Sequence, residues 1–530
     1  MSLPKDTAIV ISKGVARVFK EKFAHNGYDM EYVKAQKLSE KTGWEIITDE
    51  EAEKPSEISI GTCERGYVKD FLSRMDINQY GICRKKNKIA VCGHSLAATV
   101  LAADMLEKLG TESITDGFCE IYTNNSWIAD YPPFGGKIVS VTDCCFNGTE
   151  AVYSSGTEEY HEYLTVLEKN GYVKKYENSI CGNLFRRYEK GDTALSLSHS
   201  PAEGYTRIIS ASITSTRFAD ILRAGKEELC DITVTQMALD YIGGSFGMGY
   251  IITLRDGSFV IIDGGHVRVK EGYPKTYDYV RLYTLLRELN KRPDGKIVIS
   301  AWFITHEHSD HFNVFYHFCR EYGSLVTLNA YCACHCSNAV AYNAQNPEFH
   351  STNGRLTEAL KNIDCKTVVT LRTGDDITLG GVRFEVLYTV DDLFPRRLYC
   401  FNDCSLVMKM TANGQSVMWL GDIFTAPSDI LLKRYSPEYL KCDIACMAHH
   451  GLYGATEDLY NAIAPKVLLW SLWVRLAEKD LADDADTALR QVRVAKMLLK
   501  RESPPEVFYH TGTNYTLKMP YNSPEDLTKR

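Results

Sequence analysis

The sequence predicts an α+β protein whose C-terminal part has two β-sheets with helices packed outside them, preceded by two smaller α/β modules. Three observations predict this class. Two hairpins of one design lie at residues 249–265 and 404–422, each with a turn between two strand-like runs and an aspartate at its end. An amphipathic helical pattern lies between them at 279–291. Strand-like and helical runs alternate near the N-terminus.

The length of 530 residues exceeds what one ordinary hydrophobic core holds, so several domains are expected. We place an α/β accessory domain at 1–112, an α+β accessory domain at 113–228 and a larger domain at 229–530. The boundaries follow changes in the pattern of strands and helices along the chain.

The two accessory domains show regular elements but no constellation of catalytic residues. The first alternates strands and helices at 57–61, 67–75, 88–93 and 95–110. Ser95 is the expected N-cap of the last helix and Gly110 closes it. The second has a helix at 157–171 and strands at 183–199 and 205–212.

The charge balance limits the classes of partner. Sixty Lys and Arg residues against 68 Asp and Glu residues give a formal net charge of −8, which offers no general attraction to nucleic acid or to an anionic membrane. A nucleic-acid role would need a local basic patch. The N-terminus lacks the pattern of a secretory signal and no apolar run is long enough to span a membrane. We therefore expect a cytoplasmic protein, unless a leader was removed.

The 17 cysteines are odd in number and scattered, which suits reduced thiols better than a disulfide framework. The stretch CACHC at 332–336 has two interpretations. It offers metal ligands, but successive residues of a strand face opposite sides, and the second Cys pair of a zinc site is missing. Buried thiols on a strand are the favoured interpretation.

A cluster of histidines follows the apolar run at 296–302. The stretch THEHSDH places His306, His308, Asp310 and His311 at spacing H-x-H-x-D-H. A strand that ends here lets His306 and His308 point the same way, while Asp310 and His311 face a second ion beside the first. Imidazole nitrogen and carboxylate oxygen suit Zn²⁺, with Mn²⁺ as the alternative. The helical zinc-protease motif H-E-x-x-H is excluded, because Asp310 stands at its second histidine.

Further ligands are expected from the ends of other strands. Asp422, in WLGDI, is well placed to bridge two ions. The run at 443–448 is strand-like and leads into His449, His450 and Gly451. Each segment is a weak signal alone, but their order along the chain makes the combination strong.

In these motifs the sequence resembles the metallo-β-lactamase superfamily over about residues 231–520. The shared stretches are IIDGG, THEHSDH, NDCSLVM, LGD and HHG. The resemblance is closest to the branch with the hydrolase-like domain of DNA-internalisation (competence) proteins and the phosphorylcholine esterases. It implies an αββα sandwich, a hydrolase domain at 229–530, and metal ions at the sandwich edge. Part of the first domain resembles the accessory domain of α-glucuronidases, which implies an accessory role and makes a carbohydrate a candidate partner.

The resemblance also implies roles for individual residues. His306 and His308 would bind the first ion, Asp310 and His311 the second, and Asp422 would bridge them. His450 is the preferred final ligand and His449 the second choice. Asp263 would steady the site from behind the ligands. Asn402 belongs to the N-x-x-S-L-V strand of the branch and is a candidate for substrate binding.

The chain departs from the family pattern at several positions. Phe312 and Asn313 follow the histidine motif where small residues are usual, and Leu452 replaces the serine after HHG. The isolated histidine that many members use has only two candidates, His335 and His350, both by position alone.

We therefore expect a hydrolase with one or two divalent ions that activates a water, with Asp310 orienting that water. A phosphate ester, in particular a phosphodiester, is the expected substrate. Arg396 and Arg397 are candidate phosphate contacts, although a solvated loop also explains them. Two alternatives stay open: a metal-binding scaffold for a carbohydrate or another partner, and a nuclease for single-stranded DNA, which the acidic balance disfavours.

Overall fold

The computed structural model describes the chain at residues 3–13, 30–127, 131–144, 148–213, 230–239, 247–268, 276–336, 352–396, 398, 401–452, 454–473, 477, 493–510 and 512–530. These residues form four larger sheets and one two-stranded ribbon of β16 (Val267–Arg268) and β17 (Thr276–Tyr277). None of the helices within these ranges has the length and apolar composition needed to cross a membrane.

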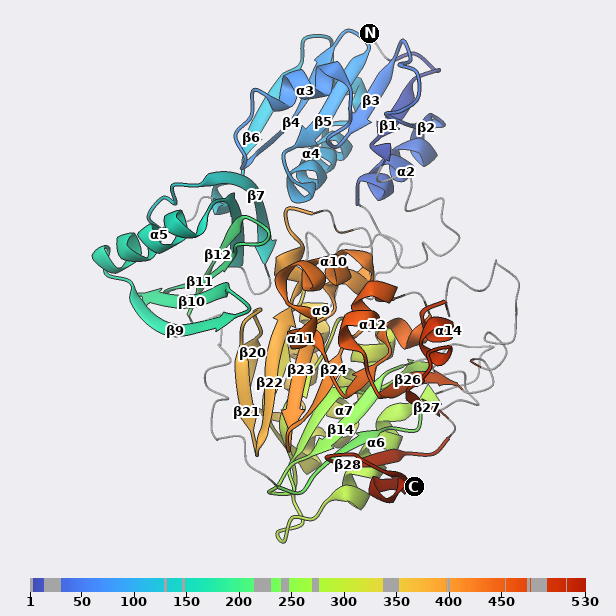
Figure 1. The fold of residues 1–530 in the computed structure, drawn as a ribbon. Helices are drawn as coiled ribbons and strands as arrows, with labels where there is room; N and C mark the ends of the chain where they lie inside the picture. Colours follow the sequence, from blue (N-terminus) through green and yellow to red (C-terminus); the bar gives the residue numbers. More distant parts are fainter. Residues whose placement is uncertain are drawn as a thin grey trace.

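The first sheet has the order β2-β1-β3-β5-β4-β6, parallel from β2 to β5 and antiparallel beyond (Figure 1). Its strands are β1 (Ala8–Ile11), β2 (Glu45–Thr48), β3 (Glu57–Ile60), β4 (Gln79–Lys85), β5 (Lys88–Gly93) and β6 (Cys119–Thr123). Its helices are α2 (Met30–Thr42), α3 (Gly66–Leu72) and α4 (Leu96–Leu109). The predicted cap of α4 is confirmed, because Ser95 Oγ accepts a hydrogen bond from the Ala98 N–H at 3.1 Å. Strand β6 lies beyond residue 112, so this sheet uses chain from both expected accessory domains, whose limits stay a prediction.

The second sheet is antiparallel throughout, in the order β7-β8-β12-β11-β10-β9. Its strands are β7 (Lys137–Cys144), β8 (Gly148–Ser154), β9 (Val173–Ile180), β10 (Asn183–Lys190), β11 (Thr193–Ser200) and β12 (Tyr205–Ser212). Helix α5 (Thr157–Lys169) packs Tyr160, Tyr163 and Leu167 onto one face. The predicted helix and strands of this region are confirmed.

The remaining two sheets contain most of the predicted third domain. One has the order β20-β19-β18-β15-β14-β13-β28-β29 and the other runs from β21 to β27 in sequence. The first consists of β13 (Ile232–Gln236), β14 (Gly249–Thr253), β15 (Phe259–Asp263), β18 (Ile297–Phe303), β19 (Val326–Ala333), β20 (Asp364–Thr370), β28 (Tyr515–Met519) and β29 (Leu527–Lys529). The second consists of β21 (Asp376–Leu379), β22 (Val382–Tyr388), β23 (Val407–Ala412), β24 (Gln415–Trp419), β25 (Ile444–Cys446), β26 (Val467–Trp473) and β27 (Glu506–His510).

Helices cover the outer faces of both sheets (Figure 1). On one side lie α6 (Asp278–Leu289), α7 (Ser309–Tyr322) and α9 (Thr352–Leu360), and on the other α10 (Thr425–Arg434), α11 (Pro437–Leu440), α12 (Glu457–Ile463) and α14 (Arg493–Leu499). Alternation along the strands explains the layers: Ile251 and Ile261 pack with α6 and α7, whereas Tyr250 and Ile262 point into the core between the sheets. This helix–sheet–sheet–helix order confirms the predicted αββα sandwich.

The two predicted hairpins place the candidate ligands. In each sandwich sheet the hairpin's second strand, β15 or β24, pairs parallel with the next strand along the sheet, β18 or β25. The C-terminal ends of parallel neighbours lie at one edge. Asp263, which ends β15, and Asp422, which follows β24, therefore come close to the histidines that follow β18 and β25.

Candidate metal centre

The histidine motif lies at the junction of β18 and α7. His306 and His308 lie in the loop after β18, while Asp310 and His311 lie in the first turn of α7, which begins at Ser309. The sequence predicted the strand and the loop. Helix α7 explains the different position of Asp310 and His311, because its first turn moves them away from His306 and His308. His308 takes the N-cap position with an extended backbone.

The predicted ligands come together as two overlapping groups. Asp310, His311, Asp422 and His450 place one ligand atom each within 4.8 Å of one another. His306, His308 and Asp422 form the second group under the same limit. Asp422 belongs to both groups, which is the arrangement of a carboxylate that bridges two ions.

Three buried polar atoms of the first group have no hydrogen-bond partner: His311 Nε2, His450 Nε2 and Asp422 Oδ1. His311 Nε2 lies 3.2 Å from Asp422 Oδ2 and His450 Nε2 lies 3.2 Å from Asp310 Oδ2, without hydrogen-bond geometry. Leaving such an atom unsatisfied costs about 1–3 kcal/mol. A cation would satisfy all three at once, so this donor set fits a divalent metal ion.

Asp263 supports the ligands from behind, in the position that the resemblance implied. Its Oδ2 accepts a hydrogen bond from His311 Nδ1 at 2.8 Å, and its Oδ1 accepts one from the Thr305 N–H at 2.8 Å. The first bond fixes the ring of His311 so that Nε2 points into the group. Asp422 is held in a similar way, because its backbone N–H donates to Ser405 Oγ at 2.9 Å.

The electrostatics of the site keep its carboxylates ionised. Burial by itself would raise the pKa of Asp422, but His311 and His450 outweigh it and hold the pKa below its usual range. The same balance lowers the pKa of Asp310. Burial lowers the pKa of His308 to about 4, which leaves its imidazole neutral at neutral pH as metal binding requires.

His311 differs from the other histidines. Burial opposes its charged form, yet Asp422, Asp263 and Asp310 raise its pKa well above the usual value. In the absence of metal, the positive charge of protonated His311 therefore balances these three carboxylates. A bound cation would balance the same negative charges.

Other candidate residues lie apart from the two groups. His449 belongs to neither, and its ring packs 4.9 Å from that of Phe424. His335 Nδ1 lies 2.7 Å from Glu307 Oε1 and its Nε2 lies 2.9 Å from the Tyr331 hydroxyl, so it is not among the candidate ligands. His350 and Arg397 lie outside the described residues.

The two described substrate-binding candidates lie in different surroundings. Asn402 is fully buried, and neither its Oδ1 nor its Nδ2 has a hydrogen-bond partner. The ring of the preceding Phe401 lies 5.1 Å from that of His308. Arg396 is 37% exposed and donates to the Ala426 carbonyl at 3.2 Å. It lines a cavity together with His94 and Ser140, and none of the candidate metal ligands lines that cavity.

The CACHC stretch ends β19 and its thiols are buried, as the favoured interpretation held. Cys336 Sγ lies 3.1 Å from Cys404 Sγ, and Cys334 Sγ donates to Asp391 Oδ2 at 3.4 Å. No sequence pattern singled out Glu307, whose Oε1 also accepts a hydrogen bond from the Cys336 N–H at 3.1 Å. Its place between two metal-ligand candidates was the only available signal.

No family model and no curated protein matches the chain. Among solved structures it is similar to the metallo-β-lactamase fold protein YhfI from Bacillus subtilis, with 13% identity, 54% of this chain and 99% of that chain covered, and a TM-score of 0.32. A diphosphatase of the PhnP family has 11% identity, 54% and 98% coverage, and a TM-score of 0.30. CmlA, a diiron β-hydroxylase from Streptomyces venezuelae, has 14% identity, 55% coverage of both chains, and a TM-score of 0.28. Similarity at this level of identity and TM-score does not support a functional assignment. The function is therefore inferred from the residues described above.

Proposed function

We propose that the protein is a metal-dependent hydrolase that uses a metal-activated water, with a phosphate ester, most readily a phosphodiester, as its substrate. One observation carries the proposal: two groups of buried His and Asp ligands share Asp422, and three of their polar atoms have no hydrogen-bond partner. A divalent ion held there would lower the pKa of a coordinated water and act as a Lewis acid on the substrate.

Asp310 is the residue that handles the attacking water. Its side chain is 26% exposed, whereas those of His306, Asp422 and His450 are at most 3% exposed. Water therefore reaches the site on the side of Asp310. Because neighbouring histidines keep the pKa of this carboxyl low, it is ionised and able to orient the water and accept its proton.

A phosphate ester is supported by a hydrogen-bonding group beside the site. The buried amide of Asn402 has unused hydrogen-bonding capacity next to Phe401, whose ring lies 5.1 Å from that of His308. The resemblance of the NDCSLVM strand to the phosphorylcholine esterase branch points the same way.

The departures from the family pattern have a packing explanation. Phe312 is 1% exposed and lies in the core between α7 and its sheet. Asn313 Oδ1 accepts a hydrogen bond from Arg355 Nη2 at 2.7 Å. Phe312 and Asn313 therefore stabilise the packing of α7. Their departure from the family pattern is no evidence for a metal-binding scaffold that lacks catalytic turnover.

The test uses the metal-loaded protein and four chromogenic substrates: a phosphodiester, a phosphomonoester, a carboxylic ester and a lactam. We expect turnover of the phosphodiester and a loss of about 100-fold or more in Asp422→Asn. Asp256→Asn makes the same charge change at a hairpin turn and should behave as wild type, since its side chain is 60% exposed.

Three results would oppose the proposal. Equal turnover by wild type and a folded Asp422→Asn would show that the candidate metal centre is not the catalytic site. Failure to hydrolyse all four substrates would favour a binding scaffold instead. Cleavage of single-stranded DNA that weakens with rising salt would favour the nuclease alternative.

A further inference from the structure

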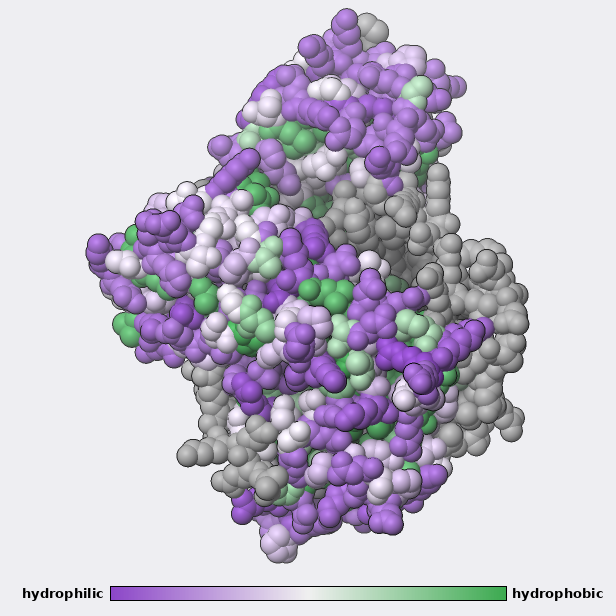
Figure 2. All heavy atoms as spheres, in the orientation of Figure 1, coloured by the Kyte–Doolittle hydropathy of each residue, from purple (hydrophilic) through white to green (hydrophobic). Residues whose placement is uncertain are grey.

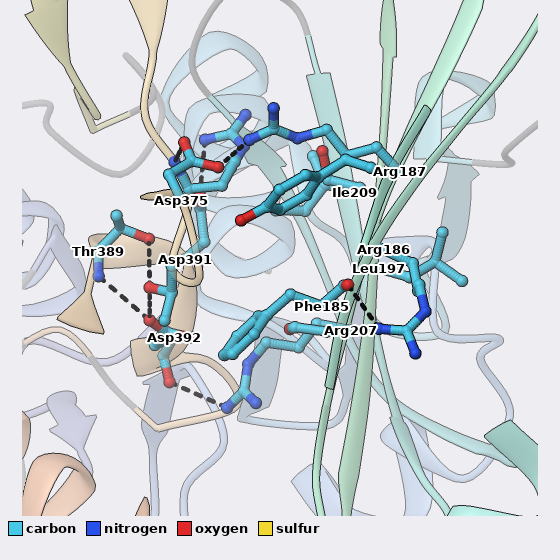
Figure 3. A pocket seen from close by; sticks show the side chains of 15 residues that line it. Phe185, Arg186, Arg187, Leu197, Arg207, Ile209, Asp375, Thr389, Asp391 and Asp392 are labelled. Carbon is cyan, nitrogen blue, oxygen red and sulfur yellow. Dashed lines mark hydrogen bonds and ion pairs between the residues drawn. The ribbon is translucent and has the colours of Figure 1, made fainter. Parts of the chain in front are cut away.

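The second sheet is joined to the sandwich through buried charged residues (Figure 3). Arg207, on β12, donates through Nη2 to the backbone carbonyls of Asp392 and Phe394, both at 2.9 Å. Arg187, on β10, forms a buried ion pair with Asp375. Contacts of this kind fix the position of the second sheet against the loop that carries η8 (Val390–Leu393).

Three metal-ligating side chains meet in this interface. Cys144, Glu150 and Asp391 place one ligand atom each within 4.8 Å of one another, and all three are buried. Cys144 and Glu150 lie on β7 and β8, where Cys144 pairs with Gly148 and Thr142 with Glu150. They are therefore diagonal neighbours on one face of the sheet, and Asp391 approaches that face from the sandwich.

Glu150 is the unsatisfied member of the group. It is fully buried, and neither carboxylate oxygen has a hydrogen-bond partner. Its ion-pair contact is with Arg207, whose Nε lies 3.9 Å from Glu150 Oε1 and is itself without a hydrogen bond. Burying a carboxylate in this way is costly unless a cation or a proton compensates it. Burial, followed by the charge of Asp391, raises the pKa of Glu150 well above its usual value.

The guanidinium groups of the interface are shared among several carboxylates. Among the residues that the structure describes, buried ion pairs join Glu150, Glu203, Asp375, Asp391 and Asp392 to Arg187, Arg207, Arg372 and Arg434. Glu150 is the carboxylate of this set without hydrogen bonds.

Asp391 is held in place by contacts outside the group. Its Oδ2 accepts from Arg372 Nη1 at 2.6 Å and from Cys334 Sγ at 3.4 Å. Hydrogen bonds of this type orient carboxylates that ligate metals. One thiol and two carboxylates form a donor set that Zn²⁺ accepts.

We propose that Cys144, Glu150 and Asp391 bind a divalent cation of the zinc type that joins the second sheet to the sandwich. Binding displaces the protons of the Cys144 thiol and of the Glu150 carboxyl. The site is separate from the candidate metal centre and does not depend on the proposed hydrolysis.

Cobalt replacement distinguishes the two sites, because every candidate ligand of the metal centre is His or Asp. The full chain, loaded with Co²⁺, should show a near-ultraviolet charge-transfer band from thiolate to cobalt. We expect Cys144→Ser to remove the band and the isosteric Glu150→Gln to weaken cobalt binding about tenfold or more.

Two controls accompany the test. Asp422→Asn should keep the band because it alters only the metal centre, and Cys442→Ser should keep it because this buried thiol lies outside the group. The proposal is overturned if cobalt-loaded wild type shows no thiolate band, or if the band persists in Cys144→Ser. Where Cys144→Ser fails to fold, Glu150→Gln decides, because cobalt binding as tight as in wild type would overturn the proposal.

Discussion

Asp422 is positioned by its backbone and acts through its side chain. Its N–H donates to Ser405 Oγ, while its carboxylate belongs to both groups of candidate ligands. The protein therefore fixes the direction of this carboxylate before any ion binds, and the energetic cost of the unsatisfied Oδ1 is borne by the folded state.

Asp263 orients His311 without reaching the ligand groups itself, so its removal should weaken metal binding rather than abolish the fold. We expect Asp263→Asn to lower metal affinity about 10- to 100-fold in equilibrium dialysis. Asp256→Asn, on the turn of the same hairpin, should leave the affinity unchanged. An unchanged affinity in Asp263→Asn would show that the hydrogen bond to His311 Nδ1 has no role in ligation.

Asp403 links stability to pH. Burial raises the pKa of its carboxyl to about 7, although the Phe424 N–H donates to its Oδ1. The unfolded value is about 4, so the folded state holds an extra proton between about pH 4 and pH 7. The free energy of unfolding should therefore fall by up to about 4 kcal/mol as the pH rises through this window.

The isosteric Asp403→Asn should remove that dependence. Urea unfolding in excess chelator, at several pH values across the window, measures it without a contribution from bound metal. Asp256→Asn serves as the control. A slope that is the same in wild type and Asp403→Asn would contradict the assignment.

At the scale of elements, the backbone after β25 presents His450 to the site. His449 and His450 have φ of 50° and 58°, and Gly451 follows with φ of 73°. A Cβ at Gly451 would overlap the indole of Trp470, whose Nε1 donates to the His450 carbonyl at 2.6 Å. This turn needs glycine both for its conformation and for space.

Gly451→Ala should therefore lower the free energy of unfolding by more than the conformational cost alone and reduce metal content, because His450 must shift. Gly414→Ala is the matched control: its φ is 76°, but nothing lies within 4 Å of the added Cβ. We expect about 1 kcal/mol for Gly414→Ala and more for Gly451→Ala in urea unfolding. Equal losses would show that the contact with Trp470 is unimportant.

The sequence predicted the elements of the site well because each ligand follows a strong strand or turn signal. Asp263 and Asp422 end two similar hairpins, and the histidines follow apolar runs, so their convergence at one sheet edge followed from the predicted architecture. The choice between His449 and His450 depended on backbone torsion in a short turn, which propensity alone does not determine. Glu307 escaped notice because its partner, His335, follows a different strand, β19, and is 28 residues away in the sequence.

At the scale of the whole molecule, the contacts between the second sheet and the sandwich were not predictable from the sequence. Arg207 and the Asp392 carbonyl are separated by 185 residues. No local pattern signals a pair of this kind, because its two residues meet only where distant parts of the chain pack together. The same holds for Cys144 and Asp391, which each looked like an ordinary residue of its own segment.

Arg434 tests how much these contacts contribute. It is 4% exposed, and it reaches Glu203 Oε2 and Asp392 Oδ1, both at 2.6 Å. Arg434→Ala leaves buried carboxylates without their partner and should cost about 3–5 kcal/mol in urea unfolding. Arg74→Ala, whose side chain is 51% exposed and pairs with the 61% exposed Asp70, should cost less than about 1 kcal/mol. Comparable losses would argue against a special role for the buried contacts.

The central claim is that the ligand groups sharing Asp422 bind metal. The most direct measurement is elemental analysis of metal per chain, on wild type and Asp422→Asn purified without added metal and again after reconstitution. We predict that wild type holds at least one divalent ion that Asp422→Asn lacks, while Asp256→Asn matches wild type. Equal metal content in wild type and Asp422→Asn, or no bound metal in wild type after reconstitution, would contradict the account.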